Sequence, residues 1–168
     1  MAAFVPVVGP VTGSTVYIDN KLRARDVSVT MPEITPVTAD VQAMGTMTVP
    51  VWQLLENLEM TFTKIGVDMG FSACIKTGVT ALEVRFTQTI MDAQGKQKTV
   101  LCKAFCRGML SSIPGIGLEV GSPVENEIPY YLTRYQLYID GQEAVLVDRL
   151  AGLARVGGET ITNDLAGL

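Results

Sequence analysis

The segment Val37–Trp52, which reads VTADVQAMGTMTVPVW, carries the pattern that decides the fold. It is rich in Val, Thr and Met, and Met44-Gly45 lies near its middle. Val and Thr are favoured in strands, and polar and apolar residues alternate before the Met-Gly dipeptide. The segment therefore predicts a long antiparallel hairpin that turns at Met44-Gly45.

Other runs on either side of this segment also have the composition or alternation of strands. They are Thr15–Asp19, Val27–Met31, Glu59–Ile65, Leu82–Met91, Thr99–Met109, Tyr130–Asp140 and Glu143–Val147. Asp92–Gly95 and Asp140-Gly141 are turn sequences, so the last four runs should form two antiparallel pairs.

One short helix is expected among these strands. Gly66–Lys76 has helical spacing, Asp68 is suited to cap its start, and Thr77-Gly78 would end it. The predicted fold is mainly β: an antiparallel β-barrel or sandwich with one short flanking helix, forming a single domain over residues 1–168.

The composition points to self-association. Apolar residues make up 48% of the 168 residues and charged residues only 18%, below the roughly 25% of a typical soluble domain. The apolar runs Phe4–Val8 and Ala144–Val147 are far shorter than the about 20 residues of a spanning helix. Met1–Val11 has no basic segment and contains two prolines, so no secretory signal and no membrane anchoring are expected. We therefore expect a cytosolic chain that buries surface against its own copies.

The sequence offers no residues for catalysis, a cofactor or a metal. It contains no His, which removes the usual general base, and its three Cys are too few for a zinc site without other ligands. Gly115–Gly121 superficially resembles a phosphate-binding loop, but its spacing is wrong and no helix is expected after it. We therefore predict a protein that is not an enzyme.

Binding to nucleic acid is not expected either. The net charge is −4, and the basic residues cluster only at Lys21, Arg23, Arg25 and at Lys96, Lys98. A grip on phosphates normally needs a larger basic patch. These clusters are interpreted as solvated surface.

Four stretches in a fixed order resemble a known family. They are Tyr17–Asn20 followed by Val29–Ile34, then Val37–Trp52 followed by Leu58–Phe62, then Tyr135–Glu143 with a final strand ending at Asp148, and last Asn163–Leu168. In order and spacing they are similar to the major tail tube proteins of contractile-tailed phages and to the tube subunits of R-type bacteriocins. The resemblance covers nearly the whole chain after Val16.

The resemblance implies a structural subunit that forms homo-hexameric rings, which stack into a hollow tube inside a contractile sheath. It implies that the 37–52 hairpin lines the lumen. The residues expected to face the lumen are Thr38, Asp40, Gln42, Thr46 and Thr48. Sheath protein outside, baseplate and tail-terminator proteins at the ends, and DNA passing without specific binding are the implied partners. Assembly would occur in the host bacterial cytoplasm, and the product would be a virion tail or released particle.

Two further segments are expected to join stacked rings. The loop Ser111–Glu127 and the C-terminal arm Arg149–Leu168 are rich in Gly or Pro but also carry apolar residues. Such residues in an exposed segment usually mark an interface. The expected contacts between rings are Ile116, Leu118, Val156, Ile161 and Leu165.

Two other readings remain open. A genome-free contractile bacteriocin or a secretion apparatus would use the same kind of tube subunit. A β-rich ligand-binding module is a different class, and it predicts a monomer with a pocket.

Overall fold

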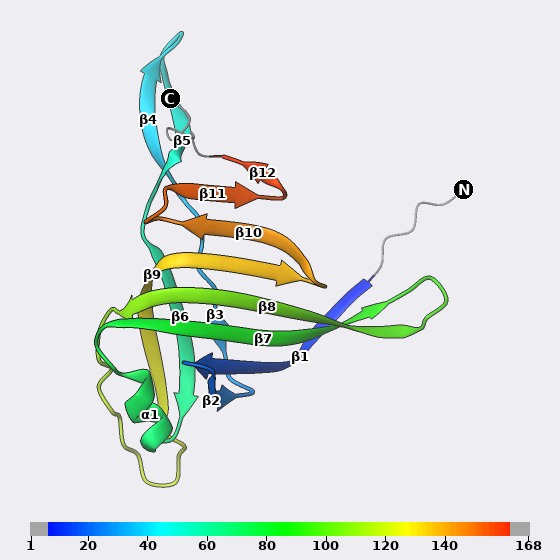
Figure 1. Ribbon diagram of the computed structural model, residues 1–168, viewed down its shortest axis with the longest axis vertical. Coiled ribbons are helices and arrows are strands. Elements are labelled where there is room, and N and C mark those ends of the chain that lie inside the picture. The colour runs from blue at the N-terminus through cyan, green and yellow to red at the C-terminus, as the bar shows by residue number, and fades with distance from the viewer. Residues whose placement is uncertain (1–6, 162–168) are drawn as a thin grey trace.

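A circuit of strands, paired with one another except at one place, forms the body of the protein in the computed structural model, which describes residues 7–161 (Figure 1). In chain order the elements are β1 (Val7–Ile18), β2 (Lys21–Arg25), β3 (Val29–Thr30), β4 (Pro36–Gln42), β5 (Thr46–Leu55), β6 (Leu58–Ile65), α1 (Met69–Cys74), β7 (Val79–Met91), β8 (Gln97–Leu110), β9 (Glu125–Ile139), β10 (Gln142–Asp148), β11 (Leu153–Val156) and β12 (Glu159–Thr160). Every pair among these strands is antiparallel.

The circuit runs through β9, β8, β7, β1 and β2. Residues 26–28 connect β2 to β3, β3 pairs with β6, and β6 returns to the first half of β9 between Leu58↔Leu132 and Ile65↔Glu125. The strands therefore wrap around one core, and the predicted mainly β, antiparallel fold with one short helix is confirmed.

Inward-facing residues of these strands fill the barrel. Val16, Met60, Val84, Ala104 and Ile128 are at most 1% exposed. Each lies in a different strand, and the residues directly before and after it are more exposed, as expected where one face of a strand is buried. The body is thus held by burial of one apolar face from each strand around the circuit.

Helix α1 covers one end of the barrel (Figure 1). Asp68 caps it as predicted, because its Oδ1 accepts a hydrogen bond of 2.9 Å from the Phe71 amide. Phe71 and Cys74 face the core, and the Tyr130 hydroxyl donates to the Cys74 carbonyl. Within residues 7–161 no helix is long and apolar enough to cross a membrane.

The second half of β9 carries the additional strands β10, β11 and β12. This corrects the expectation of an extended arm after Arg149, because β11 pairs with β10 and Ala154 is only 1% exposed. The loop after β8 is also shorter than predicted, since β9 begins at Glu125. Residues 162–168 lie outside the described residues.

The N-terminal strands are longer than the sequence predicted. β1 begins at Val7 and follows β7 through two register shifts, between Val8 and Val11 and between Val11 and Gly13. The basic residues Lys21, Arg23 and Arg25 belong to β2, whose alternate residue Ala24 is buried. The proline and two glycines of the first strand, and the small buried alanine of the second, concealed the alternation of both strands in the sequence.

A test of the barrel is available at Gly108, which lies at a register shift between β8 and β9. A Cβ there would meet the Tyr131 carbonyl oxygen and the Leu132 side chain. We expect Gly108→Ala to lower the free energy of unfolding by about 1–3 kcal/mol, because the backbone must shift. Urea unfolding measures this, with Gly115→Ala as control, since nothing lies within 4 Å of a Cβ at that position. Equal midpoints for the two variants would contradict this account of the β8–β9 contact.

Candidate functional site

The hairpin β4–β5 forms a separate two-stranded sheet that rises away from the body (Figure 1). Its register runs from Val37↔Val51 to Gln42↔Thr46. The turn lies where the sequence placed it: Met44 and Gly45 have φ values of 54° and 119°. The amide of Ala43 donates a 2.8 Å hydrogen bond to the Gly45 carbonyl, which closes the turn.

The register places polar residues on one face of this hairpin. Asp40 pairs with Thr48 and Gln42 with Thr46, and paired residues share a face. The Thr48 hydroxyl donates to Asp40 Oδ1 at 2.9 Å, and Gln42 Nε2 donates to Thr46 Oγ1 at 3.3 Å. With Thr38, two residues before Asp40, the structure brings all five predicted residues together. We call this set the polar face.

The opposite face of the hairpin is apolar. It consists of Val37, Ala39, Val41, Met47, Val49 and Val51, and we call it the apolar face. Val41 and Met47 are 46% and 49% exposed. A contiguous exposed apolar surface of this kind usually marks a contact with another molecule.

The outer edges of β4 and β5 have no strand partner among the described residues. An isolated two-stranded hairpin is marginally stable in water, and its free N–H and C=O groups are a template for pairing with another chain. Within residues 7–161 the hairpin therefore has two edges without a strand partner, and much of its apolar face is exposed.

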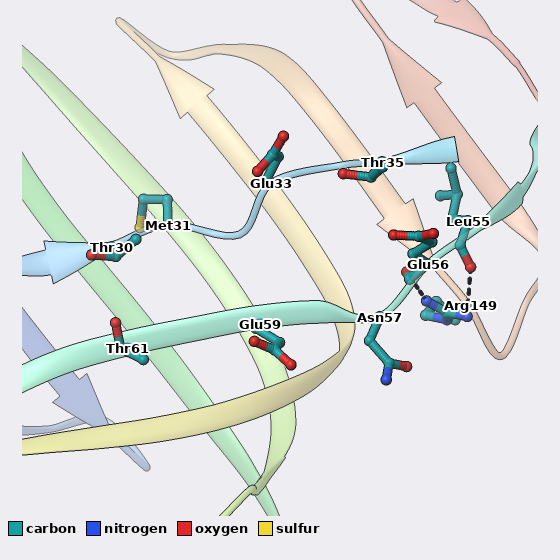
Figure 2. Close-up of a pocket in the computed structure, with 10 residues that line it drawn as sticks. All are labelled: Thr30, Met31, Glu33, Thr35, Leu55, Glu56, Asn57, Glu59, Thr61 and Arg149. Atoms are coloured by element: carbon teal, nitrogen blue, oxygen red, sulfur yellow. Dashed lines mark hydrogen bonds between the residues drawn. The ribbon is translucent and has the colours of Figure 1, made fainter. Parts of the chain in front are cut away.

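A cleft of about 750 Å³ lies at the base of the hairpin (Figure 2). Its lining includes the carboxyl side chains of Glu33, Glu56 and Glu59 and the guanidinium of Arg149. Arg149 donates hydrogen bonds to the carbonyls of Leu55 and Glu56, at 3.1 Å for Leu55, as the dashed lines in Figure 2 show. This is the place where the hairpin meets the body.

The residues predicted to join stacked rings lie in two places. Ile116 and Leu118, in the loop between β8 and β9, are 46% and 81% exposed. Val156 is 39% exposed on β11, a strand on the side of the body nearer the hairpin and away from α1 (Figure 1). Ile161 packs against the subunit's own core, so only part of its side chain is free, and Leu165 lies outside the described residues.

No catalytic constellation is built by the described residues. Between residues 7 and 161 no group of three His, Cys, Asp or Glu side chains converges as metal ligands. The glycine-rich stretch Gly115–Gly121 runs through the loop before β9 and does not open a helix. The hairpin and the cleft at its base are not needed to complete the barrel, so they are the candidate functional site.

A β-body that carries a hairpin with unpaired edges, one polar face and one apolar face is the arrangement expected of a subunit that contacts other chains. The sequence profile of a family described as phage tail tube protein FII matches residues 10–166, and the chain belongs to this family. The resemblance drawn from the sequence is thereby confirmed.

Among solved structures, this chain is similar to one in a structure entitled "Cryo-EM Structure of an Extracellular Contractile Injection System, PVC sheath-tube complex in extended state". The TM-score is 0.53 at 12% identity, over 77% of this chain and 90% of that chain. The likeness is one of fold. A comparison with curated proteins finds no match.

The three cysteines should be inert in the native protein. Cys74, Cys102 and Cys106 are at most 4% exposed, and burial raises the pKa of Cys74 to about 11 and that of Cys106 to about 12. A raised pKa leaves little reactive thiolate at mildly alkaline pH. We expect a charged thiol reagent to label none of them in the native protein and all of them after denaturation. Fast native labelling of any one would contradict the burial described here.

Proposed function

We propose that this tail tube subunit assembles with copies of itself into six-membered rings that stack into a hollow tube, with the β4–β5 hairpins joined around the lumen. The observation that carries the proposal is the two unpaired edges of the hairpin. Joining hairpins edge to edge around a ring gives their backbone groups partners and removes the free edges. Obligate interfaces of this kind bury about 2,000–5,000 Å², which agrees with the low charge of the chain.

The polar face is proposed to line the lumen. It carries Thr, Gln and a single acid, Asp40, while residues 37–52 contain no Lys or Arg. A surface without cations does not bind phosphates, so DNA could pass through a phage tail without being held. Water in the channel would solvate the hydroxyl and amide groups.

The apolar face is proposed to pack against the body of a neighbouring copy. Val41 and Met47 are directly paired across the hairpin and are both about half exposed in the single chain. Covering them would remove apolar surface from water, at about 25 cal/mol per Å². The exposed loop with Ile116 and Leu118 and the distant strand β11 with Val156 are proposed to meet between stacked rings.

The remaining parts of the assembly follow from the same proposal. A sheath outside the tube is supported by the sheath-tube complex that contains the similar chain. Baseplate and terminator proteins would cap the ends, and assembly would take place in the host cytoplasm. The family is one of structural tube proteins, and no catalytic role is proposed. A neighbouring capsid gene would indicate a phage rather than a genome-free particle.

A lysine introduced on one face or the other of the hairpin tests which face is buried in the assembly. Val41→Lys puts a charge where the apolar face should be buried, and we expect rings and tubes to be lost because an unpaired buried charge is costly. Thr48→Lys puts the same charge on the polar face, where water fills the lumen, and tubes should remain. Negative-stain microscopy and sedimentation measure assembly. A wild-type chain that stays monomeric at high concentration contradicts the proposal, and so does normal assembly of Val41→Lys.

Access to the polar face can be measured with Asp40→Cys, because the native thiols are buried. In assembled tubes we expect a small maleimide to label this cysteine along the tube and a polymer-linked maleimide to be excluded. The same protein as free subunits should react with both reagents. Rapid labelling of intact tubes by the bulky reagent would place Asp40 outside the lumen.

A further inference from the structure

The joint between hairpin and body is loosely packed. Besides the cleft of about 750 Å³, a cavity of about 330 Å³ lies between β5 and the turn after β10, and Leu55 and Arg149 line both. The two legs of the hairpin are tied to each other, because the Glu56 amide donates to the Thr35 carbonyl at 2.9 Å. The cleft and the cavity are both open to solvent, so on these two sides no side chains pack against the joint. Packing alone therefore leaves the direction of the hairpin weakly fixed.

Arg149 is the side chain that hydrogen-bonds this joint to the body among residues 7–161. Its guanidinium donates through two nitrogens to the successive carbonyls of Leu55 and Glu56 (Figure 2). Those carbonyls belong to the last residue of β5 and to the connection that leads into β6. The bonds thus hold the point at which the hairpin leaves the barrel.

The backbone that carries Arg149 is itself anchored. Its amide donates to the Thr133 carbonyl of β9 at 2.9 Å. The preceding residue, Asp148, accepts hydrogen bonds from the amides of Leu150 and Ala151 and lies 3.6 Å from Arg134. The guanidinium therefore extends from a fixed turn of the body to a poorly supported part of the chain.

The charge of the cleft favours this position of the guanidinium. Glu33, Glu56 and Glu59 line it, and Arg149 is the one cation in the lining. None of the three carboxylates forms an ion pair within 4.0 Å among the described residues. Their combined field attracts a cation without fixing it to a single carboxylate.

We propose that Arg149 is a positioning residue that holds the β4–β5 hairpin of the free subunit in the direction required to join its neighbours. This inference rests on the proposed role of the hairpin in ring formation. The planar fork of an arginine can bridge two carbonyls, whereas a lysine offers one compact charge and no such fork. Without the bridge the hairpin samples other directions, and assembly slows because fewer subunits are competent at any moment.

The single tryptophan of the chain provides the readout. Trp52 lies in β5, so its fluorescence anisotropy reports the motion of the hairpin. We compare the wild type with Arg149→Ala, Arg149→Lys and the control Arg107→Ala, which removes an exposed arginine from β8. Free subunits are measured for anisotropy and thermal unfolding, and tube growth is followed by light scattering.

We expect Arg149→Ala to unfold at nearly the wild-type temperature, to show lower Trp52 anisotropy, and to form tubes about tenfold more slowly, which corresponds to the loss of two modest hydrogen bonds. Arg149→Lys should lie between, and Arg107→Ala should match the wild type. The inference is overturned if Arg149→Ala matches Arg107→Ala in anisotropy and growth, or if Arg149→Lys restores both fully.

If Arg149→Ala fails to fold, Arg149→Lys decides the question. Lower anisotropy in a folded Lys variant supports the positioning role, and wild-type anisotropy overturns it. If the wild type itself forms no rings, the proposed function fails. The anisotropy comparison on free subunits still tests whether Arg149 holds the hairpin.

Discussion

The outer edges of β4 and β5 have no strand partner within residues 7–161, and this constraint connects the other features of the structure. In the barrel, β9, β8, β7, β1 and β6 each lie between two paired neighbours, and α1 covers one end. Most of the body's strands are therefore supported by pairing on both sides and by a shared core. The hairpin has no such support from residues 7–161, and an isolated hairpin is marginal in water. The proposed ring would supply the missing partners from neighbouring copies.

The same constraint accounts for the composition of the chain. A charged fraction of 18% and many exposed apolar side chains would be a liability in a monomer. On the hairpin, the register separates apolar from polar side chains: Val41 and Met47 are on one face, and Asp40 and Thr48 are on the other. One face is suited to contact with protein and the other to water. Under the proposed function, the polar face would line the channel and the apolar face would contact protein, which agrees with a tail tube family.

The sequence predicted those parts of the structure whose signal is local. The alternation in Val37–Trp52 and the cap at Asp68 were enough to place the hairpin and the helix, and the order of short motifs indicated the family. β2 and β11 were missed because their buried residues Ala24 and Ala154 are small and stand next to arginines, which leaves a weak hydrophobic alternation in these short strands. Arg149 could not be found at all. Its partners are backbone carbonyls 93 and 94 residues away, and a carbonyl leaves no trace in the sequence.

A free edge that must pair with a copy of itself must also avoid other partners, and the hairpin shows how both demands can be met. Pro50 removes one backbone donor from β5, and prolines and charges on edges oppose indiscriminate pairing. Asp40 adds a charge to the polar face, where it repels phosphate and other acidic surfaces. Strong packing at the base would fix the hairpin permanently, whereas two hydrogen bonds from Arg149 across an open cleft hold it weakly. The restraint proposed for Arg149 would therefore give the free hairpin a preferred direction and still allow small adjustments when neighbours in a ring contact it.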